Sequence, residues 1–387
     1  MKLNFRRSTL FILYIVGFFF ALRSALPSYI NSSFLKGITG EELVGTIYMI
    51  CSILTLVLFV LMPFLVKRIG NYRSILIFIL INIISLLVLA FSKNPYLAII
   101  SFVISYSATT ITSFFLDIFI EHESSDIETG RIRSYYLTSV NLAWLFSPWL
   151  SSHIVNGGDY WKLFIVSSFL MMPVFFIVSY NLKKFSDPDY RSFHFLKTLR
   201  ESWSKKDIKC ILLSNLLLQS FYSCMVIYTP IYLNEYIGFS WKEIGLMFTV
   251  MLLPFVLIQI PLGRLADKKM GEKELLTFGF IVMSISTGLI AFIEVKTIWI
   301  WAVLLFLTRV GAATVEVMTE TYFFKNISSK NVNLISLFRT MPPFAYIITP
   351  IFSTIILLYS NYNFLFMFLA FLMLFGVRYS LAIKDTR

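Results

Sequence analysis

Residues 73–91 read RSILIFILINIISLLVLAF, a run of 19 residues whose single charge is at its first position. A helix of about 20 apolar residues is long enough to cross the hydrocarbon core of a bilayer. Hydrophobic residues make up 58% of the 387-residue chain and charged residues only 14%. In soluble domains, about 45–50% of the residues are apolar and about 25% are charged. The composition therefore excludes a soluble enzyme and indicates a membrane protein.

Apolar runs of similar length recur along the chain. Because lipid offers no partner for an unpaired backbone group, each run is expected to be a helix. The runs lie near residues 9–30, 43–66, 73–91, 96–120, 134–156, 161–181, 208–233, 244–263, 275–293, 297–323, 332–358 and 362–383. Prolines at 148, 342, 343 and 350 are expected to break or bend their helices. The sequence thus predicts an all-α polytopic membrane protein with twelve transmembrane helices.

The distribution of basic residues predicts the orientation. If both termini are cytoplasmic, the cytoplasmic segments carry 25 of the 33 Lys and Arg residues, and the opposite side carries five. The other three, Arg23, Arg309 and Arg339, lie inside predicted spans. Cytoplasmic loops of membrane proteins carry such an excess of positive charge. The net charge of +12 is therefore attributed to membrane orientation and not to nucleic-acid binding.

The longest hydrophilic stretch, 182–207, separates six predicted spans from six. It is expected to be a cytoplasmic linker between an N-terminal half, 1–181, and a C-terminal half, 208–387. The halves resemble each other, since the first span ends in PSYIN at 27–31 and the seventh in PIYLN at 230–234. Parallel repeats of this kind are typical of transporters, whose substrate sites lie between the repeats.

Residues 263–271, between predicted spans eight and nine, read GRLADKKMG. This stretch is similar to the G-x-L-A-D-[RK]-x-G loop of the major facilitator superfamily, with one extra residue before the second glycine. The first-half copy at 63–73 is degraded and has lysine in place of the usual aspartate. Residues 308–313, TRVGAA, resemble the arginine motif that usually lies in span four. Residues 158–164, GDYWKLF, resemble the Trp-containing turn before span six.

The resemblance covers essentially the whole chain and implies a fold of two pseudo-symmetric six-helix halves. It also implies secondary transport by alternating access, with a cavity lined by spans one, four, seven and ten. The residues that it assigns to the gating loops are Gly263, Arg264, Asp267, Lys268, Gly271, Lys67, Arg68 and Arg73.

The tenth span carries three charges on one stripe, Arg309, Glu316 and Glu320, at spacings of seven and four residues. Burying a charge inside the membrane costs free energy, so a charged residue in a span is taken as a candidate functional residue. We expect Glu316 to carry a proton, with Arg309 competing for the carboxylate. The alternative is an ion-pair network that only holds the helices together.

Two further charged residues are candidates for ion pairs. Asp117 in span four is the repeat counterpart of Glu320, and either is expected to pair with basic loop residues as a cytoplasmic latch. Arg339 in span eleven is expected to pair with Glu316 or Glu320. The alternative for Asp117 is that its carboxylate lies at the membrane interface and is solvated by water.

Candidate substrate-binding side chains lie in spans one and seven. Arg23 is a candidate for an anionic substrate group, with snorkelling to the interface as the alternative. The polar residues of span seven suit a hydroxyl-bearing or amphipathic substrate, or else bond between helices. They are Asn215, Gln219, Tyr222 and Tyr228.

No cofactor or metal is predicted, because the three histidines are scattered and the three cysteines form no CxxC pair. The chain lacks a nucleotide-binding P-loop. We predict a monomeric, proton-coupled transporter of the plasma or inner membrane, with a small molecule and protons as partners and a slight preference for efflux of amphipathic compounds. The alternatives are an uptake permease for a sugar, nucleoside or small anion, and, in another class, a lipid-modifying membrane enzyme or a non-transporting sensor.

Overall fold

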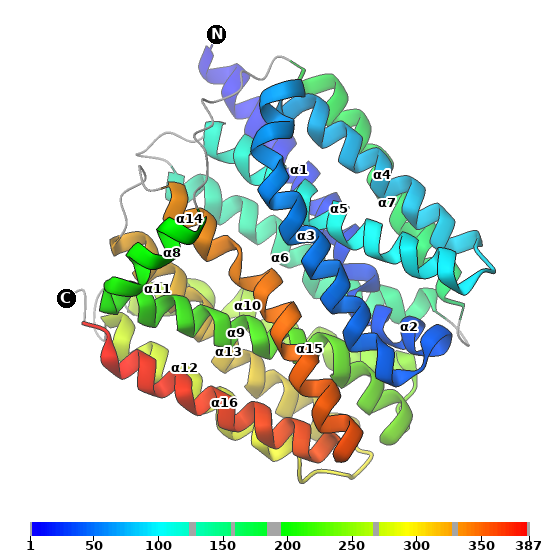
Figure 1. Ribbon diagram of the computed structural model, residues 1–387, viewed down its shortest axis with the longest axis vertical. Helices are drawn as coiled ribbons and strands as arrows, with labels where there is room; N and C mark the ends of the chain where they lie inside the picture. Colours follow the sequence, from blue (N-terminus) through cyan, green and yellow to red (C-terminus); the bar gives the residue numbers. More distant parts are fainter. Residues whose placement is uncertain are drawn as a thin grey trace. The chain divides into compact units, whose positions relative to one another are not determined.

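The computed structural model describes residues 2–123, 129–155, 159–183, 195–265, 271–326 and 332–384, and every regular element in these ranges is a helix. The helices form two compact units (Figure 1). Unit 1 consists of Met1–Gly40 and Ile50–Ser192, and unit 2 of Glu41–Met49 and Phe193–Arg387. The first seven residues of the second predicted span, 43–49, therefore belong to unit 2, which the simple division at the linker does not anticipate.

In unit 1, two helices each pack against two others, and one of these others is common to both. Its helices are α1 (Lys2–Ser28), α2 (Asn31–Thr39), α3 (Glu41–Ile69, shared with unit 2), α4 (Asn71–Phe91), α5 (Pro95–Glu123), α6 (Thr129–Ile154) and α7 (Tyr160–Asn181). Helix α1 packs against α6 and α7, and α4 packs against α5 and α7.

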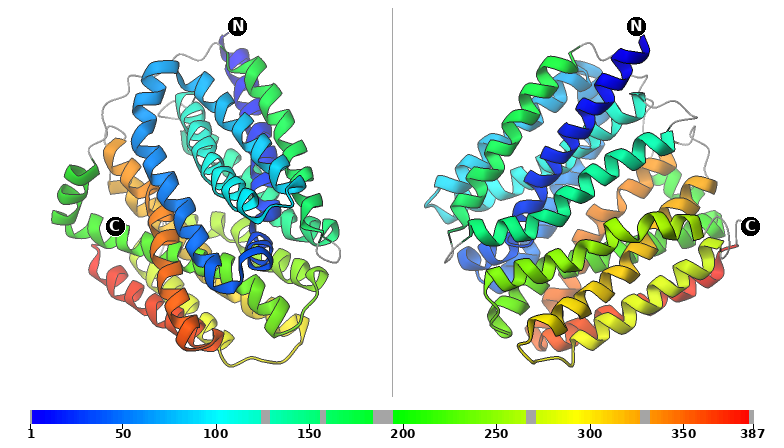
Figure 2. Two further views of the ribbon diagram at one scale, coloured as in Figure 1. Left: turned by 45° about the vertical axis from the view of Figure 1, so that its right-hand side comes forward. Right: turned by 180° about the vertical axis from the view of Figure 1, so that it is seen from behind.

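Unit 2 repeats these pairings. Its helices are α8 (Phe195–Ser204), α9 (Lys206–Ile231), the π-helical turn η1 (Tyr232–Tyr236), α10 (Trp241–Leu257), α11 (Gln259–Leu265), α12 (Gly271–Ile290), α13 (Ile298–Asn326), α14 (Val332–Arg339), α15 (Met341–Tyr359) and α16 (Tyr362–Ala382). Helix α9 packs against α15 and α16, and α12 against α13 and α16 (Figure 2). The pairings of spans 1–5, 1–6, 3–4 and 3–6 thus recur as 7–11, 7–12, 9–10 and 9–12.

The two loops expected to be gates share a structural glycine. Gly70, between α3 and α4, has a φ of 81°, and Gly271, at the start of α12, has a φ of 72°. Glycine adopts this left-handed region without the steric penalty of a side chain. Gly70 in the first half therefore has the same left-handed conformation as Gly271 in the second, although the first-half motif lacks the aspartate.

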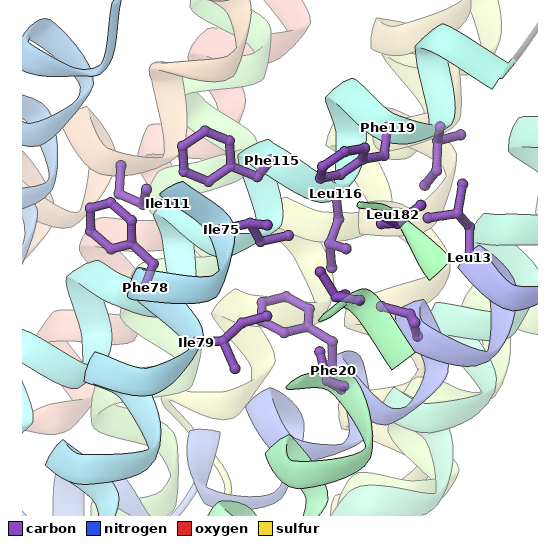
Figure 3. Close-up of a cluster of buried hydrophobic side chains, with 14 of the residues drawn as sticks. Leu13, Phe20, Ile75, Phe78, Ile79, Ile111, Phe115, Leu116, Phe119 and Leu182 are labelled. Carbon is purple, nitrogen blue, oxygen red and sulfur yellow. The ribbon is translucent and has the colours of Figure 1, made fainter. Parts of the chain in front are cut away.

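The core of unit 1 is a cluster of aliphatic and aromatic side chains from α1, α4, α5 and α7, including Phe20, Ile79 and Phe115 (Figure 3). Large apolar side chains also lie on the outer faces of the helices. Val60 is 71% exposed, Phe176 65% and Trp299 68%. Such surfaces are stable against lipid and not in water. The chain is a multi-pass membrane protein.

Ten of the described helical segments are long and apolar enough to cross a bilayer. The predicted spans five and eight, found in α6 and in α10 with α11, do not meet this criterion. Helix α10 has only 17 residues. Helix α6 contains five serines, and two of them bond to α1 carbonyls: Ser139 Oγ donates to Tyr14 O (3.0 Å) and Ser151 Oγ to Leu26 O (2.5 Å). The polarity of α6 therefore serves helix contacts.

Span eleven differs from the single helix that was predicted. Helix α14 ends at Arg339, and α15 begins at Met341 with Pro342 and Pro343 in its first turn. Proline is favoured there because its missing N–H has no intrahelical partner at that position. Helices α2 and α8 and the turn η1 were not predicted; α8 lies within the stretch taken as a linker.

Helices α12 and α13 approach each other through glycines. A Cβ atom on Gly311 would lie 2.7 Å from the carbonyl oxygen of Gly279 and from the backbone N of Met283. Small residues allow membrane helices to pack backbone against backbone. Gly288, also in α12, has room for a methyl group, since its Cβ would lie in ordinary van der Waals contact, 3.5 Å from Ala370 Cβ.

We predict that Gly311→Ala destabilises the protein by about 1–3 kcal/mol, because the added methyl group overlaps backbone atoms that cannot rotate away. The matched variant Gly288→Ala should be neutral or stabilising by about 0.5–1 kcal/mol, as expected for Gly to Ala in a helix. Thermal unfolding of the purified variants measures both. Equal melting temperatures for the two variants would contradict the close α12–α13 contact.

Candidate functional site

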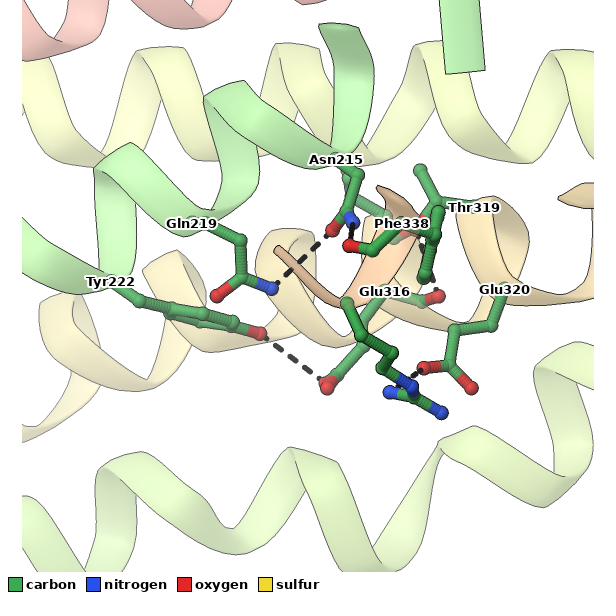
Figure 4. Close-up of polar contacts among 9 residues, drawn as sticks. Asn215, Gln219, Tyr222, Glu316, Thr319, Glu320 and Phe338 are labelled. Carbon is green, nitrogen blue, oxygen red and sulfur yellow. Dashed lines mark hydrogen bonds and ion pairs between the residues drawn. The ribbon is translucent and has the colours of Figure 1, made fainter. Parts of the chain in front are cut away.

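The charged stripe of α13 lies within unit 2 beside α9 (Figure 4). Arg309 is buried, with 2% of its surface exposed, whereas Glu316 and Glu320 are half-buried. The hydroxyl of Tyr222 in α9 donates a hydrogen bond to Glu316 Oε2 at 3.3 Å. The structure therefore brings together two residues that the sequence placed in separate groups, a proton-carrier candidate and a substrate candidate.

Arg309 does not pair with Glu316. Its guanidinium carbon lies 5.0 Å from the ring centre of Phe221 and 5.7 Å from that of Tyr222, both in α9. Within the described part of the chain, Nη1 of Arg309 has no hydrogen-bond partner. The reason is geometric, since seven residues of helix separate Arg309 from Glu316 by about 10 Å along the axis. Aromatic rings attract a cation through their faces and take the place of the carboxylate.

Arg339, the last residue of α14, pairs with Glu320, and not with Glu316; Nη1 lies 3.1 Å from Oε1. Their side chains are 41% and 34% exposed. Ion pairs this accessible contribute about 0–1 kcal/mol, so the bond is weak enough to break during a conformational change.

The amides of span seven bond within the protein. Asn215 Nδ2 donates to the carbonyl of Phe338 at 3.4 Å, and Gln219 Nε2 donates to Asn215 Oδ1 at 3.3 Å. A helix would bond the Phe338 carbonyl to the N–H of residue 342, but that residue is proline and has none. Asn215 supplies the missing donor, which favours the helix-bonding alternative for this residue. Tyr228 lies further along α9 and lines a cavity of about 680 Å³ within unit 2.

Among the residues of unit 1 whose side chains the structure describes, Arg23 is a buried cation, with 3% of its surface exposed. Nη2 donates to Ser105 Oγ at 2.9 Å, and Nη1 donates to Thr109 Oγ1. Asn82 Nδ2 also donates to Thr109 Oγ1, at 2.8 Å. The guanidinium is held inside the unit and does not snorkel. Sequence reasoning missed both partners of Arg23, Ser105 and Thr109. The only signal was Asn82, the single amide of the run 73–91, which bonds to Thr109.

The remaining predicted residues are placed as follows. Asp117 is half-buried in α5, and Lys67, Arg68 and Arg73 are exposed. Gly263 and Arg264 lie in α11, and Gly271 begins α12. Asp267 and Lys268 lie outside the described residues. Over the described ranges, no three His, Cys, Asp or Glu side chains gather as a metal site would require.

Comparisons with known proteins point to one family. The sequence model of the Major Facilitator Superfamily matches residues 211–385. A comparison with curated proteins finds no relative with significant sequence similarity.

Solved structures of two transporters have a similar fold. A crystal structure of the nucleoside transporter NupG has a TM-score of 0.71 at 14% identity, covering 96% of this chain and 98% of that one. A crystal structure of a NupG point mutant has a TM-score of 0.76 at 12% identity, and the match covers 96% of this chain and 99% of that one. The xylose transporter XylE from E. coli, in a partially occluded inward-open conformation, gives 0.72 at 13%, covering 99% of both chains.

These likenesses cover both units, and the family match falls on the α9–α16 region that holds the α13 stripe. Residues 211–385 therefore match the sequence pattern of the Major Facilitator Superfamily, and the fold of the chain is similar to that of the two solved transporters.

Proposed function

We propose that the chain is a proton-coupled secondary transporter that works by alternating access and exports amphipathic small molecules. The observation that carries the proposal is the hydrogen bond between Tyr222 and Glu316, which joins a span-seven residue to a carboxylate in span ten. In the expected cavity both spans face the substrate. Because the proton acceptor is bonded to a phenol that faces the substrate, protonation of Glu316 and binding of substrate can each affect the other.

Glu316 is the proposed proton carrier. A charge at this depth is costly, so protonation changes the energy of every arrangement of the surrounding helices. When Glu316 is ionised, the Tyr222 hydroxyl donates to it. When Glu316 is protonated, it no longer needs that donor, and the phenol is released toward substrate. Arg309 keeps positive charge nearby without occupying the carboxylate.

The cytoplasmic ends of the helices are proposed to act as latches. The exposed bond between Arg339 and Glu320 is weak enough to open and close. Asp117 and the basic residues at 67–73 form the corresponding candidates in the first half, and Asp267 with Arg264 and Lys268 complete the second.

A second candidate function is uptake of a nucleoside, a sugar or a small anion. Two observations favour it: the fold resembles those of a nucleoside and a xylose transporter, and the described residues give Arg23 hydroxyl and amide neighbours but no carboxylate. A lipid-modifying enzyme is disfavoured, because the family and the similar structures point to a non-enzymatic transporter. Liposomes loaded with ethidium, uridine or xylose distinguish the remaining candidates by which compound the chain carries.

The orientation is proposed from the basic residues, with both termini and the 182–207 segment in the cytoplasm. In intact cells expressing Ser186→Cys, a membrane-impermeant maleimide should not label the protein until the cells are opened. Lys93→Cys, on the opposite side, should be labelled at once. The native Cys51, Cys210 and Cys224 are buried and give little background. Labelling of residue 186 from outside would reverse the orientation.

The coupling role predicts the behaviour of Glu316→Gln in liposomes. This variant mimics the protonated state, so it should lose accumulation of substrate driven by a pH gradient while retaining counterflow exchange of substrate. Tyr222→Phe should reduce accumulation less, because it removes one hydrogen bond and no charge.

Tyr72→Phe is the matched control. It also removes a phenol hydroxyl in a span, but that hydroxyl bonds to the backbone carbonyl of Ser179 and to no carboxylate. Wild-type accumulation in Glu316→Gln would reject Glu316 as the carrier and leave a structural role for the cluster.

A further inference from the structure

Helix α8 is a ten-residue helix that directly precedes a membrane span. It ends at Ser204, and the candidate span that contains α9 begins at Lys206. Lys205, between them, has φ and ψ of −95° and 107°, an extended backbone that separates the two helices. At 1.5 Å per residue α8 is about 15 Å long, too short to cross the hydrocarbon core. The C-terminal end of α8 therefore lies at the membrane surface, at the level of the lipid headgroups.

The sequence of α8, FLKTLRESWS, is amphipathic, with apolar residues at positions 195, 196, 199 and 203 on one helical stripe. The helix packs against α14 and the start of α9, and Figure 1 shows it beside α14. Leu199 is half-buried and Ser202 is buried, so this part of α8 faces the unit. Trp203, at the edge of the stripe, stays 48% exposed. Unit 2 therefore covers only part of the apolar stripe.

Two cations lie next to the exposed indole. Nζ of Lys209, in the first turn of α9, lies 5.0 Å from the ring centre of Trp203. A cation over the face of an indole is attracted by the ring. Arg200 is exposed and lies three residues before Trp203, which makes the two side chains neighbours on the helix surface. The indole and the two bases thus form one exposed surface.

The chain around this surface carries positive charge. Residues 197–209, KTLRESWSKKDIK, contain five lysines or arginines and two acids. Lys205 and Lys206 are exposed. One of the acids, Asp207, accepts a hydrogen bond from the backbone N–H of Lys384 at 3.3 Å. The surface is therefore complementary to an anion.

The combination of bases and an indole at headgroup level favours an anionic phospholipid as the occupant. Its phosphate accepts charge-assisted hydrogen bonds from guanidinium and ammonium groups. Its glycerol backbone and the first carbons of its acyl chains are apolar enough to pack on an indole, and tryptophan is enriched at this depth of the membrane. A soluble anion would use the bases but would gain nothing from the exposed ring.

We propose that Arg200, Trp203 and Lys209 form a binding site for an anionic phospholipid of the surrounding bilayer. The lipid phosphate accepts hydrogen bonds from Arg200 and Lys209, and the indole packs on the glycerol backbone. Lys205 and Lys206 add to the local positive potential, which attracts anionic lipids. The site involves neither the transported compound nor the proton, so it stands independently of the transport mechanism proposed above.

Native mass spectrometry of the purified, detergent-solubilised chain measures the preference for headgroup charge. The probes are dioleoylphosphatidylglycerol, which is anionic, and dioleoylphosphatidylcholine, which is zwitterionic and has the same acyl chains. The anionic lipid should bind about five-fold or more tightly. Inorganic phosphate at the same concentration as the lipid should not displace it, because phosphate has no apolar part to contact Trp203.

Variants locate the binding. Arg200→Gln and Lys209→Gln should each weaken the affinity for phosphatidylglycerol by about two- to five-fold and leave that for phosphatidylcholine unchanged. Lys296→Gln is the matched control. Lys296 also lies over an aromatic ring, 5.8 Å from the ring centre of Phe239, but beyond the far end of α9, which is about 39 Å long. It already interacts with the carboxylate of Glu243, so this variant should leave both affinities unchanged.

Fluorescence quenching in nanodiscs tests whether Trp203 contacts the lipid. Phospholipids brominated near the headgroup end of their acyl chains quench indoles that they touch. The difference in emission between the wild-type chain and Trp203→Phe isolates the signal of this indole. That signal should be quenched more strongly by brominated phosphatidylglycerol than by an equal fraction of brominated phosphatidylcholine.

Four results would overturn the proposal: equal affinity for the two lipids, a preference for phosphatidylglycerol that Arg200→Gln and Lys209→Gln both leave unchanged, displacement of the lipid by inorganic phosphate, or a Trp203 signal that neither brominated lipid quenches. None of these measurements involves transport. A failure of proton coupling in liposomes would therefore leave the lipid site intact, and the reverse also holds.

Discussion

A hydrocarbon environment gives polar groups no hydrogen-bond partner, and this constraint shapes both units of the protein. Its effect is clearest where the helix itself fails to supply a donor. Pro342 leaves the Phe338 carbonyl without an N–H, and Asn215 on α9 donates to it. At the end of α1, the Leu26 carbonyl accepts from Ser151 on α6. Each of these bonds joins two helices, so satisfying the backbone also holds the unit together.

The buried arginines satisfy the same constraint in another way. Arg309 lies over two aromatic rings, and Arg23 bonds to the hydroxyls of Ser105 and Thr109. Neither forms an ion pair with a carboxylate in the described ranges. Glu316 therefore accepts a hydrogen bond from a phenol, while Arg309 lies nearby without pairing with it. A carboxylate held by a neutral donor gains and loses a proton without breaking an ion pair, which suits a coupling role.

The sequence predicts the helices well because their apolar runs are long and their turns carry glycine and proline. It also predicts the repeat, whose motifs at 27–31 and 230–234 mark equivalent helix ends. It does not predict the partners of single side chains. Whether Arg309 contacts Glu316 or Phe221 depends on how α9 packs against α13. The periodicity of residues within one helix carries no information about that packing. The cavity in unit 2 was missed for a related reason: its lining residues Glu41, Glu294 and Tyr362 come from three distant segments, and only packing brings them together.

The central claim is that the movement of substrate is coupled to the movement of protons, and the most direct test is to use a substrate gradient to drive proton movement. Liposomes containing the wild-type chain and a trapped pH-sensitive dye receive a gradient of the compound that the panel identifies, with no imposed pH gradient. Coupled transport predicts a change of internal pH that protein-free liposomes do not show and that a protonophore abolishes. Substrate movement with an unchanged internal pH would contradict the account.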